Sequence, residues 1–183
     1  MRHDTWMALR AVCCLAMIAT GAIGCRGSEA KDPPALPPLA LTLTRGATST
    51  GDLFLRPRTS GEFVTATLTN VGTVPAFVNS RLLVGGPTTP REIALEFLGP
   101  DKRPRTFRSL VNASATSRSW QRLEPGASVS VVVDLEADYD LSMKGFYDVQ
   151  ATYENAQDAP AGASDLPSWK GRVVSPVLRF ERK

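Results

Sequence analysis

Histidine and cysteine are almost absent from this sequence. The single histidine is His3 and the three cysteines are Cys13, Cys14 and Cys25, so residues 26–183 contain neither imidazole nor thiol. Cysteine nucleophiles, Ser-His-Asp triads, zinc sites with His or Cys ligands, haem ligation by histidine and disulfides all need these groups. The sequence therefore excludes these kinds of site from residues 26–183.

Long apolar runs, a sustained helical period and a strong excess of one charge are also missing. The 183 residues are 43% hydrophobic and include 21 basic and 18 acidic residues. This composition is typical of one globular domain, with or without a tail, and excludes collagen-like repeats, charge-driven disorder and multi-span membrane proteins. The mostly apolar run at residues 11–23 would rise only about 20 Å as a helix, less than the roughly 30 Å of a hydrocarbon core.

The N-terminus has the pattern of an export signal. Arg2 and Arg10 precede the uncharged run, and small residues follow it. The sequence Ala22-Ile23-Gly24-Cys25 resembles the lipobox of bacterial lipoproteins, with Ala22 where leucine is usual. The resemblance implies that residues 1–24 are removed and that Cys25 carries acyl chains that bind a membrane. Plain secretion after cleavage near the same place is the alternative.

The residue after the lipidated cysteine bears on localisation. Arg26 stands where an aspartate would favour retention in the inner membrane, so the resemblance implies the outer membrane of a Gram-negative bacterium, on its periplasmic or surface face. Residues 25–38 contain four prolines and few groups to bury, and we expect them to form a lipidated tether.

From Leu39 onward apolar residues alternate with polar ones, as half-buried strands require. Turn sequences rich in glycine, proline and asparagine separate the alternating segments. The pattern predicts an all-β fold over residues 39–183, an antiparallel immunoglobulin-like β-sandwich of about seven strands. The expected strands are Leu39–Thr44, Glu62–Asn70, Ala76–Val84, Glu92–Leu98, Ser128–Leu135, Phe146–Glu154 and Arg172–Phe180.

Two residues of this pattern predict local detail. Pro176 cannot donate to a ladder, so the last strand should be an edge strand or be bulged there. Tyr147 stands near the start of the sixth strand, where a tyrosine corner would place its hydroxyl against the upstream backbone. An ordinary buried aromatic is the alternative for Tyr147.

Several stretches carry a resemblance to a known family. They are Leu123-Glu124-Pro125-Gly126-Ala127-Ser128, Val133-Asp134-Leu135, Tyr139-Asp140-Leu141-Ser142, Gly145-Phe146-Tyr147-Asp148-Val149 and, upstream, Leu68-Thr69-Asn70 and Phe97-Leu98-Gly99. Together they resemble the non-catalytic β-sandwich region of deuterolysin-like and peptidyl-Lys metalloendopeptidases, over roughly residues 39–155. Those peptidases bind zinc through an H-E-x-x-H helix, which this sequence lacks. The resemblance therefore implies a free-standing sandwich without peptidase activity.

The connection of residues 99–126 is long and basic, with six basic residues against two acidic ones. Long connections carry function more often than short ones. We predict a binding surface for anionic lipid or an acidic envelope protein, in which two tryptophans make amphipathic contacts. Its candidate residues are Lys102, Arg103, Arg105, Arg108, Arg118, Trp120, Arg122 and Trp169. In an immunoglobulin-like order this connection should lie at the end where the tether enters, with the acidic residues Glu136, Asp138 and Asp140 at the opposite end.

The sequence favours a non-enzymatic, lipid-anchored binding or scaffolding protein of the cell envelope. It predicts no cofactor, no metal site and no nucleic-acid partner, and it leaves the oligomeric state open. Two other functions stay open. One is a proteinase inhibitor that inserts an extended loop such as Gly99–Ser109 into a protease. The other is a histidine-free hydrolase that uses two carboxylates in a deep pocket.

Overall fold

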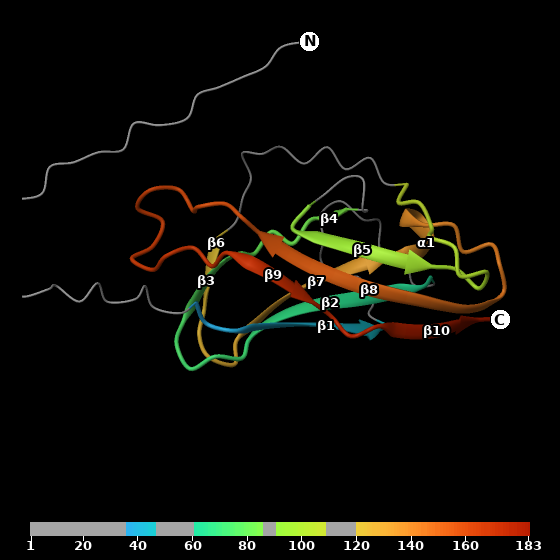
Figure 1. Ribbon diagram of the computed structural model, residues 1–183, viewed down its shortest axis with the longest axis horizontal. Coiled ribbons are helices and arrows are strands. Elements are labelled where there is room, and N and C mark those ends of the chain that lie inside the picture. Colours follow the sequence, from blue (N-terminus) through green and yellow to red (C-terminus); the bar gives the residue numbers. More distant parts are fainter. Residues whose placement is uncertain (1–35, 47–60, 86–90, 109–119) are drawn as a thin grey trace, which may run out of the picture. The chain divides into compact units, whose positions relative to one another are not determined.

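The computed structural model describes residues 36–46, 61–85, 91–108 and 120–183, which are coloured in Figure 1. The chain divides into a unit of residues 1–34 and a compact unit of residues 35–183, and the described residues belong to the second. The predicted leader, Cys25, most of the tether and Arg118 lie outside the described residues. None of the helices in the described ranges has both the length and the apolar character needed to span a membrane.

The protein is all-β, as the sequence predicts. The described residues form one helical turn and ten strands: β1 (Leu39–Arg45), β2 (Phe63–Asn70), β3 (Ala76–Asn79), β4 (Val84–Gly85), β5 (Ile93–Leu98), β6 (Trp120–Leu123), β7 (Ser128–Asp134), α1 (Leu135–Asp138), β8 (Gly145–Asn155), β9 (Gly171–Val174) and β10 (Leu178–Arg182).

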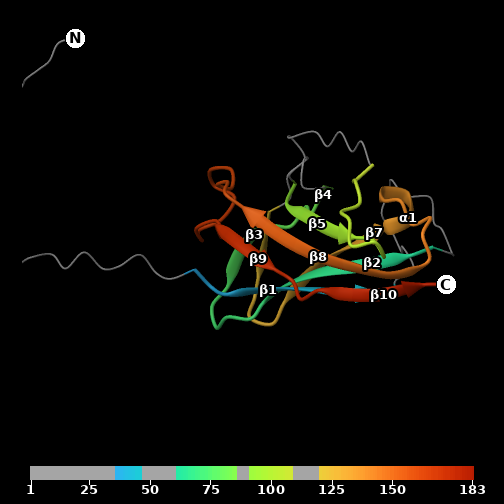
Figure 2. The same cartoon turned by 45° about the vertical axis from the view of Figure 1, so that its right-hand side comes forward.

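The strands make three sheets (Figures 1 and 2). One has the order β1-β2-β7, a second has the order β10-β8-β5-β4 with β9 also pairing with β8, and the third is the pair β3-β6. All of these pairings are antiparallel except that of β4 with β5, which is parallel.

One buried cluster holds the sheets together. Alternate residues of β2 point into it, among them Val64, Ala66 and Leu68, and alternate residues of β8 meet them, among them Tyr147 and Val149. Each fully buried side chain of this size contributes about 1.5–3 kcal/mol relative to exposure. The residues that recur with a period of two along these strands are therefore the ones that pack the core.

The expected strand Ala76–Val84 is wrong as a single element. Its first half is β3, which pairs with β6, and its end is β4, which runs parallel to β5. The chain changes sheets between them, where Leu82 is fully buried with a φ of 49°. Strand β6 and helix α1 were not predicted, because four residues are too few to establish a period.

The prediction for Pro176 is confirmed. Strands β9 and β10 both pair with β8 along one edge, and residues 175–177 stand opposite only Gln150 and Ala151, which defines a bulge. Ser175 closes the gap, since its Oγ accepts a hydrogen bond from the Ala151 N–H at 2.9 Å.

The contact expected of Tyr147 is also present. Its hydroxyl donates a 2.7 Å hydrogen bond to the carbonyl of Met143, four residues upstream. The ring is fully buried and stacks on Phe97 and Phe180, with centroid distances of 5.4 Å and 5.6 Å. This bond fixes the connection that leads from α1 into β8.

Candidate functional site

The basic segment after β5 folds back on that strand. The Gly99 N–H donates to the carbonyl of Arg103, and the Arg105 N–H donates to the carbonyl of Phe97 at 2.7 Å. Lys102 has a φ of 61° in the tight turn between them. Residues 99–103 are therefore a tight turn where an extended loop was expected, Pro104 pairs with Leu98, and Ser109 lies outside the described residues.

Acidic partners neutralise most of the cations of this segment. Arg105 pairs with Asp101 at 2.8 Å, and Arg108 pairs with Asp140 at 3.1 Å. Arg103 alone among the four cations of residues 99–108 has no carboxylate partner within the described ranges. The segment is thus much less electropositive than its sequence indicates.

Asp148 binds two cations at once. Its carboxylate accepts hydrogen bonds from Arg179, at 2.6 Å and 3.0 Å, and from Lys102 at 2.9 Å. These bonds, with that of Arg179 the largest contribution, lower the pKa of Asp148 well below the ordinary aspartate range. Lys102 is therefore part of a strand-linking ion cluster.

The expected placement of the two charge groups is wrong. The Arg108 N–H donates to the carbonyl of Asp138, so the basic and acidic residues lie at the same end of the domain. The tether enters at the other end, where Leu39 pairs with Asn70 (Figures 1 and 2). The cause is the parallel pairing of β4 with β5, which makes β5 run away from the tether instead of toward it.

The remaining candidate residues lie at the tether end. Trp120 stacks on Phe77 with a centroid distance of 5.8 Å, and Arg122 pairs with Glu124 at 2.6 Å. Trp169 is only 6% exposed, and its Nε1–H donates to the carbonyl of Pro37 at 2.9 Å. Trp169 therefore fastens the tether to the domain and is not a surface contact.

The seven described candidates thus form two groups. Lys102, Arg103, Arg105 and Arg108 lie at the α1 end, and Trp120, Arg122 and Trp169 lie at the tether end. The structure does not bring them together into one binding surface.

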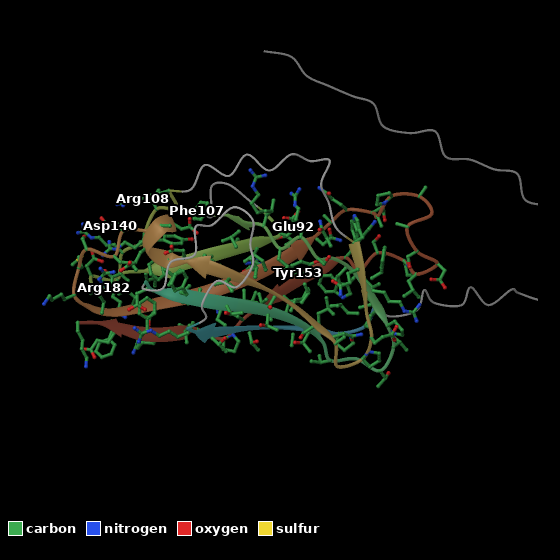
Figure 3. All side chains as sticks on the ribbon, turned by 180° about the vertical axis from the view of Figure 1, so that it is seen from behind. Glu92, Phe107, Arg108, Asp140, Tyr153 and Arg182 are labelled. Atoms are coloured by element: carbon green, nitrogen blue, oxygen red, sulfur yellow. The ribbon has the colours of Figure 1, made fainter. Side chains whose placement is uncertain are left out.

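A polar pocket of about 450 Å³ opens where β3 and β8 end and β5 begins. Figure 3 shows Glu92 of this pocket above Tyr153. Its lining residues are Asn79, Arg81, Arg91, Glu92, Glu154, Asn155, Ala156 and Gln157. Sequence analysis missed all of them, because they come from three segments that only the folded chain brings together.

Hydrogen bonds order the base of the pocket. Glu92 Oε1 accepts from Asn79 Nδ2 and from Arg81 Nη2, each at 3.3 Å. The Tyr153 hydroxyl donates to the carbonyl of Asn79 at 3.2 Å from beneath, and burial raises the pKa of Tyr153 far above its ordinary value. The Arg81–Glu92 pair is close to nine-tenths buried, so its geometry is held by the fold.

Three buried asparagines hold the connections at the tether end. Asn70, Asn79 and Asn155 are the last residues of β2, β3 and β8, and each is at most 4% exposed. The amide of Asn155 donates to the carbonyls of Gln157 and Trp169, which fixes both ends of the connection between β8 and β9. Each strand end therefore passes into a turn that a buried side chain holds in place.

The pocket offers ion pairs and amides for binding. Within residues 36–46, 61–85, 91–108 and 120–183, no three acidic, histidine or cysteine side chains are grouped to hold a metal ion. No protein-family model matches the chain, and no curated protein matches it.

Proposed function

We propose that this protein is a lipid-anchored, non-enzymatic binding module of the bacterial cell envelope, built on an immunoglobulin-like β-sandwich. The leader at residues 1–24 and the lipobox ending at Cys25 support export and anchoring. The outer membrane follows from Arg26 by the same resemblance.

The strand order supports the immunoglobulin-like topology. The sheet β1-β2-β7 corresponds to strands A, B and E of that fold, and β10-β8-β5 corresponds to G, F and C. The hydroxyl of Tyr147 makes the tyrosine-corner bond at the start of the F-like strand. Such a sandwich is also what the resemblance to the non-catalytic region of deuterolysin-like metalloendopeptidases implies.

In this topology the direction of each strand determines at which end of the sandwich the connections after the B-like, C-like and F-like strands lie. Those after β2 and β8 share the tether end, and antibody variable domains bind their ligands through the equivalent connections. The observation that carries our proposal is the pocket formed there by residues 79–81, 91–92 and 154–157, with buried asparagines holding its walls. Preorganised walls reduce the entropic cost of binding.

The proposal is tested by cross-linking the full chain in its native envelope. Glu154 and Gln157 are exposed at the pocket rim, so Glu154→Ala with Gln157→Ala should remove cross-links to a specific partner without loss of fold. Lys144→Ala, an exposed change at the other end, is the matched control and should retain them. Equal cross-linking by wild type and the rim variant would argue against this pocket as the binding site.

Anchoring needs a separate measurement. Mass spectrometry of the protein from membranes should show residues 1–24 missing and a diacylglycerol thioether on Cys25. Cys25→Ser should release the protein from the membrane fraction. A membrane-bound Cys25→Ser variant would contradict the proposed anchor.

A further inference from the structure

Three large apolar side chains are exposed where the tether meets the domain. Val71 and Val74, in the turn between β2 and β3, are 56% and 50% exposed, and Leu36, directly before Pro37, is 40% exposed. We name this group, Leu36, Val71 and Val74, the apolar tip. Residues 71–75 and 36–44 contain no charged side chain, and the adjoining end of β6 and the turn after it carry the exposed Arg122–Glu124 ion pair, in which the two charges neutralise each other.

The turn that carries Val71 and Val74 packs against Pro37 and Pro38 of the tether, directly after Leu36. The Val71 N–H donates to the carbonyl of Pro38 at 3.1 Å. A Cβ on Gly72 would lie 2.8 Å from Pro38 Cδ, which shows how closely the two segments approach. On the other side of the turn, the buried amide of Asn70 donates to the carbonyl of Val74 at 2.8 Å. These bonds therefore hold the turn in a conformation in which both valines are exposed.

The position of the tip relative to the anchor decides what would cover it. Eleven residues lead from Cys25 to Leu36, and even fully extended they span no more than about 40 Å. The chain enters the described domain at the tip itself. Acyl chains on Cys25 would hold this surface close to a bilayer at high effective concentration.

We propose that the apolar tip inserts into the interfacial region of the membrane that holds Cys25, so that the domain stands on the bilayer with its tether end down. This inference rests on the proposed lipid anchor. Valine and leucine side chains gain free energy on entering the acyl boundary, and the hydroxyl of Thr73 between the valines remains at headgroup level.

The test uses the full lipidated protein in vesicles of phosphatidylethanolamine and phosphatidylglycerol with brominated acyl chains. Because acylation occupies the thiol of Cys25, Thr73→Cys provides a single site for an environment-sensitive fluorophore. Lys144→Cys, exposed at the α1 end, is the matched control. We expect bromine quenching and a blue shift at position 73, and neither at position 144.

A second variant separates insertion from mere proximity. Val71→Thr with Val74→Thr changes two exposed side chains, so the thermal midpoint should shift little while the quenching at position 73 is lost. A fluorophore at position 73 that is unquenched in protein that still floats with the vesicles overturns the inference and leaves the anchor intact. Quenching that persists in the double variant also overturns the inference, because the valines would then not be what inserts. Shielding of position 73 that requires other envelope proteins overturns it as well, because the surface would then bind protein and not lipid. Protein that does not float at all overturns the anchor and, with it, the inference.

Discussion

Replacing Asn70 by alanine removes the side chain on which the tether end of the domain depends. Its Nδ2 donates to the carbonyls of Val74 and Leu123, at 2.8 Å and 2.9 Å, and its Oδ1 accepts from the Gly72 N–H at 2.9 Å. One fully buried amide thus joins the turn after β2 to strand β6. The substitution leaves the backbone hydrogen bonds of residue 70 with residues 126 and 127 available.

The three lost bonds differ in what replaces them. Leu123 is fully buried, so water cannot reach its carbonyl easily, and an unsatisfied buried group costs about 1–3 kcal/mol. Val74 is exposed and the turn at Gly72 is near the surface, so water can replace those two bonds at about 0.5 kcal/mol each. We therefore expect Asn70→Ala to lower the free energy of unfolding by about 3 kcal/mol. For a domain of this size that corresponds to roughly 9 °C in Tm.

Urea and thermal unfolding of the two proteins measure the effect. Asn70→Asp is a more specific test, because it retains the acceptor for the Gly72 N–H but places a carboxylate against two carbonyl oxygens. It should lower the free energy of unfolding at least as much as the alanine substitution does. Val71→Ala, an exposed change one residue on, should cost less than about 0.5 kcal/mol. If Asn70→Ala were as stable as Val71→Ala, or Asn70→Asp were as stable as wild type, the amide would not be what holds this end together.

Three further changes test other parts of the fold. Asp148→Asn should lower the free energy of unfolding by about 1 kcal/mol at neutral pH. Because the native pKa of Asp148 is lowered, this contribution is fully present above about pH 4 and fades as the pH falls below that value, so wild type and variant should converge in urea unfolding at low pH. Ser175→Ala should cost about 1–2 kcal/mol, since it leaves a buried N–H of β8 without its acceptor, and amide hydrogen exchange should locate the loss at residue 151. Gly99→Ala places a Cβ against the guanidinium of Arg105 and should cost about 1 kcal/mol, but much less in an Arg105→Ala background; equal costs in both would contradict that contact.

The sequence predicts the long strands well because their burial repeats every second residue. Strands β1, β2, β5, β7 and β8 lie within two residues of the expected bounds. The bulge at Pro176 follows from the missing N–H of that residue, and the bond of Tyr147 follows from its place at the start of β8. These features depend on local chemistry, which a single sequence contains.

The pairing of short elements could not be predicted in the same way. The sequence Gly85-Gly86-Pro87 indicates a turn whether the strands beside it run parallel or antiparallel. Strand β4 has only two residues, and its partner on β5 is decided by packing around the buried Leu82. The polar pocket was missed for a related reason, since Arg81, Glu92 and Glu154 are neighbours only once β3, β5 and β8 are in place.

The net charge of a connection in the sequence also did not predict the charge of its surface in the fold. The acidic residues that neutralise Lys102 and Arg108 lie 46 and 32 positions away along the chain, so the excess of arginine in residues 99–108 was expected to form a positive end. Ion pairs between exposed side chains contribute only about 0–1 kcal/mol each to stability. Their effect here is on the electric field of that end, which they largely cancel.

The direction of β5 decides which surface of the domain lies near the proposed anchor. If β5 ran toward the tether, the cations of residues 99–108 would lie beside the acyl chains and electrostatic attraction to anionic lipid would be the natural interaction. Because β4 and β5 are parallel, that segment lies at the far end, and the exposed apolar side chains of Leu36, Val71 and Val74 lie near the tether instead. Apolar side chains bind by burial of apolar area, which salt does not screen. The proposed contact between the domain and the bilayer should therefore persist at high ionic strength, where an arginine-mediated contact would be lost.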